Sequence, residues 1–158
     1  MTEFTHVDEK GHVRMVDVTD KKSGHRVAVA QGEISMNAGT LKKILDQTVK
    51  KGNVLETARI AGIMGSKKTS ELIPMCHPLN LTHVSIDFFP DTEKNRIRIE
   101  ATARLIGKTG VEMEALTAAS IAALTIYDMC KSHDNRITVS NIYLLRKSGG
   151  KSGTFVRN

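Results

Sequence analysis

Residues 84–105 of the chain are VSIDFFPDTEKNRIRIEATARL, and this stretch decides the fold class. Val84, Ile86 and Phe88 alternate with more polar residues in its first part, and apolar residues occupy the odd positions of 97–105 in its second part. Such alternation is typical of strands that bury one face. Because the segment 90–95 between them is polar and begins with a proline, the stretch predicts a β-hairpin.

The residues before the hairpin predict one strand and two helices. Apolar alternation over residues 26–36 predicts the strand, and Asn37 is a suitable N-cap for the helix that follows it. Asn53 with Glu56 three residues later resembles a capping box, which predicts a second helix that Pro74 ends. This helix carries a stripe of small residues: Ala58, Ala61, Gly62 and Gly65. We expect another element to pack very close to the stripe, which could also help two chains approach each other.

The residues after the hairpin predict a long helix and a last strand. Thr109 and Glu112 have capping-box spacing and open a helix that we expect to run to about Ser132, and residues 137–145 form the strand. The predicted order is β-α-α-β-β-α-β. With the first two helices as one broken crossover, this is the ferredoxin-like split βαβ fold. We expect a single α+β domain over residues 1–158, with an antiparallel sheet and helices on one face.

Both ends of the chain are polar. Residues 1–25 predict an arm with at most one edge strand, around Val16 and Val18, and the first residues lack the apolar core of a signal peptide. Residues 146–158 form a tail rich in glycine and lysine, which could bind phosphate through backbone N–H groups and lysine charge or could be disordered. The tail is not a P-loop, because Leu145 stands where that motif requires glycine.

The composition limits the class of protein and of partner. A net charge of +6 on 158 residues points to an anionic partner, while the absence of Trp argues against stacking on single-stranded nucleic acid. No apolar run reaches the roughly 18 residues of a membrane span. Cys76 and Cys130 form no CxxC pair, and no Cys or His has the spacing of a structural zinc site. We therefore expect a cytoplasmic protein without a metal site, and neither nucleic acid nor membrane as a partner.

The motifs alone allow an enzyme that acts on a phosphorylated ligand. Asp128 and Lys131 share a face of the long helix, where they form either a surface ion pair or an acid/base couple. Glu112 and Glu114 lie in its first turn, where the helix dipole favours carboxylates in any case. His77 lies between two prolines in a loop, and it is either functional or simply exposed.

Five runs of the sequence resemble one known family, the molybdenum cofactor biosynthesis protein C (MoaC-type) family. They occur in the family's order and cover nearly the whole chain: 15–18 (MVDV), 58–63 (ARIAGI), 72–79 (LIPMCHPL), the stretch from 107–117 (GKTGVEMEALT) through 127–131 (YDMCK), and 147–153 (KSGGKSG). The resemblance implies a ferredoxin-like subunit that assembles into a homohexamer, built as a trimer of dimers.

The resemblance also implies a reaction. The substrate would be 3′,8-cyclo-7,8-dihydroguanosine 5′-triphosphate, which becomes cyclic pyranopterin monophosphate as pyrophosphate leaves. This is a lyase reaction, for which we expect no cofactor; a requirement for a divalent ion stays open. A triphosphate substrate accounts for the positive charge of the chain, because cations stabilise charge that develops during such a reaction.

Site residues follow from the same resemblance. Asp128 and Lys131 look like the acid/base centre, with Lys51 as a further catalytic cation. The implied substrate-binding residues are Met75, Cys76, His77, Glu112, Met113, Glu114, Lys147 and Lys151. Of these, the paired carboxylates suit a guanidine-like N–H edge, and the two lysines of the tail are expected to contact phosphate.

Glu114 and Asp128 are too far apart for one substrate to reach both in a single chain. They lie fourteen residues apart on one helix, which corresponds to roughly 21 Å. We therefore expect a composite site at a dimer interface.

Two other functions compete with this interpretation. A non-enzymatic basic module that binds nucleotide or RNA would account for the charge, and its binding would depend strongly on salt. A purely structural, oligomer-forming subunit would tolerate Asp128→Asn without loss.

Overall fold

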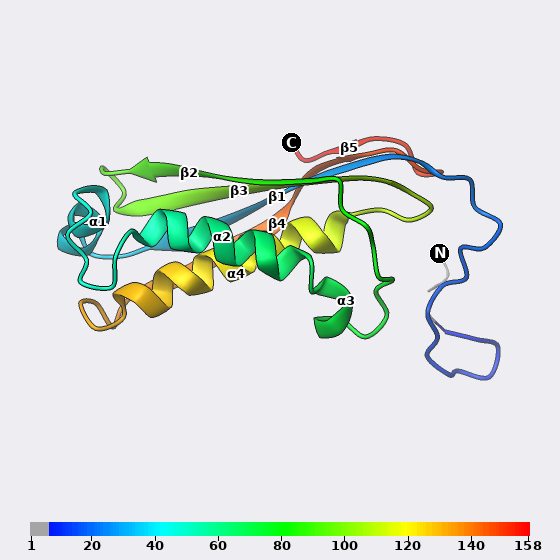
Figure 1. Cartoon of the computed structure of the whole chain (residues 1–158), viewed down its shortest axis with the longest axis horizontal. Coiled ribbons are helices and arrows are strands. Elements are labelled where there is room, and N and C mark those ends of the chain that lie inside the picture. Colours follow the sequence, from blue (N-terminus) through cyan, green and yellow to red (C-terminus); the bar gives the residue numbers. More distant parts are fainter. Residues whose placement is uncertain (1–6) are drawn as a thin grey trace.

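The computed structural model describes residues 7–158 as an elongated molecule with a sheet on one side and helices on the other (Figure 1). Residues 1–6 lie outside the described part, and with them the start of the predicted arm and the expected lack of a signal peptide. The elements are β1 (Gly24–Ser35), α1 (Ala38–Leu45), α2 (Val54–Ser66), α3 (Thr69–Leu72), β2 (His83–Asp91), β3 (Arg96–Gly107), α4 (Glu112–Cys130), β4 (Thr138–Ser148) and β5 (Phe155–Val156).

The sheet has five strands in the order β2-β3-β1-β4-β5, and all of its pairings are antiparallel. The hairpin of β2 and β3 lies at one edge, as the sequence predicts. Each helical crossover passes over one intervening strand, which is the arrangement of the split βαβ plan. The predicted antiparallel α+β fold is confirmed, and α2 and α4 lie side by side on one face of the sheet (Figure 1). The sequence did not predict β5.

Helix α4 lies close to the sheet because its buried face consists largely of alanine. Ala115, Ala118, Ala119, Ala122 and Ala123 are fully buried. The strands beneath are also built from small residues, with Ala28, Ala30, Ala101 and Ala103 fully buried. Larger side chains such as Ile34, Ile97 and Ile99 complete the core, and each contributes about 1.5–3 kcal/mol through burial.

The stripe of small residues on α2 packs against α4 of the same chain. A Cβ added at Gly62 would meet the side chain of Ile86 and would lie 2.7 Å from the backbone oxygen of Ala118. A Cβ at Gly65 would lie 2.8 Å from Cγ1 of Ile121. Glycine is therefore required by the contact between the helices, which confirms the expected close packing. That the stripe also helps two chains approach stays a prediction.

The polar caps of α1 and α2 are confirmed. The side chain of Asn37 accepts a hydrogen bond from the backbone N–H of Thr40 at 2.7 Å, and that of Asn53 accepts one from Glu56 at 3.1 Å. Each bond satisfies an N–H that has no partner within the first turn.

The capping box predicted at Thr109 does not form. Helix α4 begins at Glu112 without a side-chain cap, and the Thr109 hydroxyl instead donates to the backbone oxygen of Gly110. The Glu112 side chain folds towards Gly110 and forms an ion pair with Lys147, so it is not free to complete a capping box.

Several predicted boundaries also move. The single helix expected before Pro74 is two helices, α2 and α3. No strand forms around Val16, and the arm instead contains an isolated bridge between Val7 and Val13. The tail is ordered by β5, whose Phe155 pairs with Lys147. No helix within residues 7–158 combines the length and apolarity needed to cross a membrane.

The packing of α2 on α4 predicts that Gly62→Ala destabilises the fold. We expect a loss of about 1–3 kcal/mol, because the Ala118 carbonyl belongs to the backbone and cannot rotate away from the new methyl group. Gly39→Ala in α1 is the matched control, since its Cβ would meet only the Asn37 side chain, at 3.4 Å. Urea unfolding measures both variants, and equal midpoints would contradict the account.

Candidate active site

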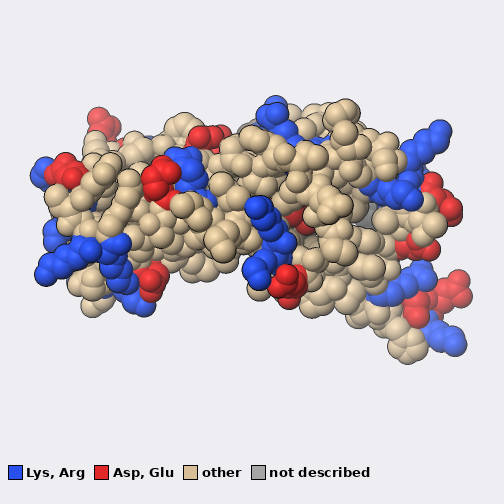
Figure 2. Space-filling model, viewed as in Figure 1, with Lys and Arg blue, Asp and Glu red and all other residues tan. Residues whose placement is uncertain are grey.

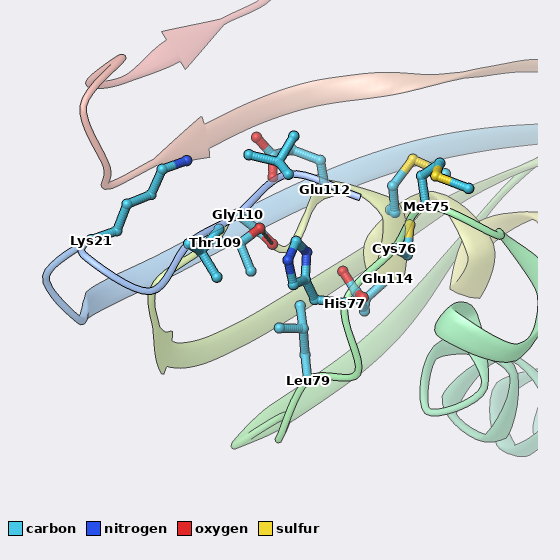
Figure 3. Close-up of a pocket in the computed structure, with 12 residues that line it drawn as sticks. Lys21, Met75, Cys76, His77, Leu79, Thr109, Gly110, Glu112 and Glu114 are labelled. Carbon is cyan, nitrogen blue, oxygen red and sulfur yellow. Dashed lines mark hydrogen bonds between the residues drawn. The ribbon is translucent and has the colours of Figure 1, made fainter. Parts of the chain in front are cut away.

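A cavity of about 270 Å³ lies at the N-terminal end of α4. Its walls come from four segments: the arm, the loop after α3, the connection between β3 and α4, and the first turn of α4 (Figure 3). The lining residues are Val16, Val18, Lys21, Met75, Cys76, His77, Leu79, Thr109, Gly110, Glu112, Met113 and Glu114. The cavity thus contains six of the substrate-binding residues expected from the sequence: Met75, Cys76, His77, Glu112, Met113 and Glu114.

Sequence reasoning missed the contribution of the arm to this cavity. Val16 and Val18 lie within the run 15–18, which already marked the arm, but nothing in the sequence distinguishes Lys21 from its neighbour Lys22. Lys108 holds the arm in place by donating from Nζ to the backbone oxygen of Thr19 at 2.7 Å. A long-range contact of this kind leaves no periodic signal in the sequence.

Glu112 connects the cavity to the tail. One of its carboxylate oxygens lies 2.8 Å from Nζ of Lys147 on β4, and both side chains are about three-quarters buried. Lys147 Nζ also lies 3.4 Å from the hydroxyl of Ser152. The expected tail residue Lys147 therefore lies beside the cavity, whereas Lys151 is exposed in the following turn.

Glu114 is the most deeply buried acid of the cavity, at 4% exposure. Burial raises its pKa to about 7, its own backbone N–H opposes this, and the charge of Glu112 adds to the rise. The pKa of the neighbouring Cys76 thiol is also raised, first by burial and then by Glu114. Both effects arise because a low-dielectric environment disfavours the charged forms.

Arg26 is a further residue that the sequence did not single out. It is 8% exposed, and its Nε donates to the backbone oxygen of Gly107 at 3.2 Å. No carboxylate in the described chain lies within ion-pair distance of it. The tail crosses over it at Gly149 and Gly150, whose φ angles are +93° and +86°. A buried guanidinium without an anion is a suitable place for one to bind.

A second cluster of charged residues lies at the opposite end of α4. Lys131 Nζ lies 2.7 Å from Oδ1 of Asp128, and Lys51 Nζ lies 3.4 Å from its Oδ2. Lys51 also donates to the backbone oxygen of Asp128 at 2.8 Å. The three expected catalytic residues are thus brought together, and all three side chains are about half exposed.

Hydrogen bonds fix the charge states in this cluster. The bonds from Lys131 and then Lys51 lower the pKa of Asp128, and the bond to Asp128 raises the pKa of Lys131. Asp128 is therefore held as a carboxylate near neutral pH, with Nζ of Lys51 and Nζ of Lys131 against its two oxygens. Within one chain the cluster presents net positive charge to the solvent.

Helix α4 holds the two clusters apart. Glu114 lies in its first turn and Asp128 near its end, so they are separated by roughly 21 Å along the axis. Figure 1 shows that the two ends of α4 lie near opposite ends of the helical layer. A single chain therefore does not bring the cavity and the Asp128 cluster together.

The surface charge does not resemble that of a nucleic-acid-binding face in the view shown. Lys, Arg, Asp and Glu are intermixed, and no continuous basic stripe crosses this face (Figure 2). Within residues 7–158, no three His, Cys, Asp or Glu side chains gather in a way that could hold a metal ion.

The chain is similar to known proteins over nearly its whole length. The model of the MoaC family matches residues 15–150. A protein of Desulfatibacillum aliphaticivorans, named cyclic pyranopterin monophosphate synthase, is 67% identical over 156 residues, which cover 99% of this chain and 98% of that protein. A protein of Roseiflexus sp. (strain RS-1) with the same name is 55% identical over 158 residues, the full length of both.

The crossing of the tail over Arg26 predicts that Gly149→Ala releases the tail. Its Cβ would collide with the backbone oxygen of His25, whereas a Cβ at Gly153 would meet nothing within 4 Å. Both glycines have positive φ, so Gly153→Ala controls for the backbone cost of about 1–2 kcal/mol. We expect faster amide hydrogen exchange at Phe155 and Val156 in Gly149→Ala only. Equal exchange in the two variants would contradict this packing.

Proposed function

The chain belongs to the MoaC family, and from this premise we propose that it is a cyclic pyranopterin monophosphate synthase. It converts 3′,8-cyclo-7,8-dihydroguanosine 5′-triphosphate into cyclic pyranopterin monophosphate and pyrophosphate, in molybdenum cofactor biosynthesis. The observation that carries this proposal is the identity of 55–67% over essentially the whole chain to relatives with that name. The reaction is a lyase reaction, and we infer that it takes place in the cytoplasm, where the free thiols of Cys76 and Cys130 stay reduced.

The chemistry of the substrate matches the two kinds of site. Its guanine-derived ring has N–H donors beside a carbonyl oxygen, and the cavity offers Glu112, Glu114 and the Cys76 thiol to such an edge. Its triphosphate carries several negative charges, which suit the unpaired guanidinium of Arg26, the lysines of the tail and the cluster of Lys51 and Lys131.

Closure of the cyclic phosphate needs both a proton acceptor and cations. A substrate hydroxyl oxygen attacks the α-phosphorus, the bond from that phosphorus to the bridging oxygen breaks, and the electron pair leaves with pyrophosphate. The hydroxyl proton must be accepted, and Asp128, held as a carboxylate by its lysines, is available for this. Lys51 and Lys131 then stabilise the charge that develops on the leaving group.

The separation of the two clusters supports a site shared between subunits. In this proposal the Asp128 cluster of one protomer faces the cavity of its partner, within a homohexamer arranged as a trimer of dimers. The half-exposed side chains of the cluster are accessible to such a partner. Exposed apolar residues on the outer faces of α2 and α4, namely Ile60, Met64 and Leu124, also favour association.

The competing functions have less support. A nucleotide- or RNA-binding module would not require a buried acid in its cavity, and the charges on the face in Figure 2 are mixed. A structural subunit would not require a carboxylate held between two lysines.

Removing a charge from the Asp128 cluster should lower turnover strongly. Asp128→Asn and Lys131→Ala should each lower kcat by about 10²- to 10⁴-fold, the usual contribution of acid/base catalysis. Pyrophosphate release from the purified protein measures this. The matched control is Glu71→Gln, which removes an exposed ion pair with Lys68 of the same i,i+3 spacing. Full activity of Asp128→Asn in a folded protein would refute the assignment.

A shared site predicts complementation between two inactive variants. Asp128→Asn and Glu112→Gln place one defect in each half of the site, so random mixing of subunits should restore about one quarter of parental activity. The mixture is unfolded and refolded together before the assay, and each variant alone is treated identically. No gain above the separate variants would mean that each site lies within one chain.

A further inference from the structure

The two acids of the first turn of α4 lie in different environments. Glu112 forms an ion pair with Lys147, whose Nζ lies 2.8 Å from a carboxylate oxygen of Glu112. Glu114, two residues further on, is 4% exposed and forms no ion pair with any residue of the described chain. Pairs of carboxyl groups whose environments push their ionisation apart serve different chemical roles.

Within one chain, the described groups around Glu114 supply no cation to it. The loop after α3 contributes the Cys76 thiol and the His77 ring, the arm contributes Lys21, and α4 contributes the Glu112 carboxylate. Glu112 repels a second negative charge, and burial penalises it further, so the pKa of Glu114 lies at about 7. Lys21 lines the cavity but makes no ion pair within the described chain, and Lys147 is already engaged by Glu112.

We propose that Glu114 binds the substrate as a neutral carboxylic acid and donates its proton in a hydrogen bond to the ring carbonyl oxygen, while Glu112, paired with Lys147, accepts from the ring N–H groups. This inference rests on the proposed function for the identity of the substrate. It makes Glu114 a specificity-determining residue. A ring with an amino group in place of the carbonyl would leave two donors facing each other, and sites built on hydrogen bonds reject such analogues strongly.

The proposal has a defined dependence on pH. Below about pH 7 Glu114 carries its proton and can donate, and above this pH the donor is lost. Because kcat/KM reports ionisations of the free enzyme, it should fall about tenfold per pH unit once Glu114 ionises. The same sign holds for stability: a carboxyl with a raised pKa binds its proton more tightly in the folded state, so it destabilises the fold as pH rises.

The first test needs no substrate. Thermal unfolding of the parent, Glu114→Gln and Glu112→Gln is compared at pH 5.5 and pH 8.5. The stability that Glu114→Gln gains relative to the parent should be larger at pH 8.5 than at pH 5.5, because the destabilisation by Glu114 grows between its ordinary pKa of 4.5 and its raised pKa of about 7. Glu112→Gln, which breaks the pair with Lys147, should show no such gain. The infrared band of a protonated carboxyl at pH 5.5 should be absent from Glu114→Gln and present in Glu112→Gln. A parent that lacks this band would overturn the proposal.

The second test uses the cyclic dihydroguanosine triphosphate and follows kcat/KM from pH 6 to pH 9. The parent should lose activity above about pH 7, and Glu114→Gln, whose amide donates at every pH, should lose this dependence. If the substrate itself titrates in this range, its effect on kcat/KM remains in Glu114→Gln, so the comparison separates it from the effect of Glu114. An unchanged pH profile in Glu114→Gln would overturn the role as donor. If the parent shows no turnover, the proposed function is refuted, and so is the role of Glu114 in binding that substrate. The first test still decides whether Glu114 is protonated.

Discussion

The close packing of α4 against its neighbours is the constraint on which the rest of the structure depends. Alanine faces alanine between α4 and the central strands, and Gly62 lies against the Ala118 carbonyl between α4 and α2. Side chains this small bury little apolar area each, so the stability of the contact comes from many well-fitted atoms at close range. Such an interface can rearrange in few ways, so the packing fixes the position of α4 relative to the sheet and α2.

A rigid helix of fixed length also determines what one chain can do. The acids of the cavity lie at one end of α4 and the Asp128 cluster at the other, and no movement of side chains closes a gap of roughly 21 Å. A site that needs both therefore needs two chains. In this proposal the division of the site between two chains follows from the length of one helix.

The electrostatics of the two ends differ in kind. At the Asp128 cluster, two half-exposed lysines bond a carboxylate and lower its pKa, an arrangement that suits a phosphate-bearing ligand. In the cavity, burial keeps Glu114 near the balance between its charged and neutral forms, while the tail supplies a cation to Glu112 only. Residues of the same type, two positions apart, thus lie in different surroundings.

The sequence by itself determined the elements that depend on local chemistry. The alternation over residues 84–105 predicted the hairpin, and Asn37 and Asn53 predicted the starts of two helices. The runs that resemble the family contain most of the residues that line the cavity. Three outcomes were decided only by the tertiary structure. Glu112 forms an ion pair with Lys147 and no capping box. Gly62 packs against α4 of the same chain, and the tail passes over Arg26. Those outcomes depend on residues far apart in the chain, and contacts between distant residues leave no local pattern from which they could be predicted.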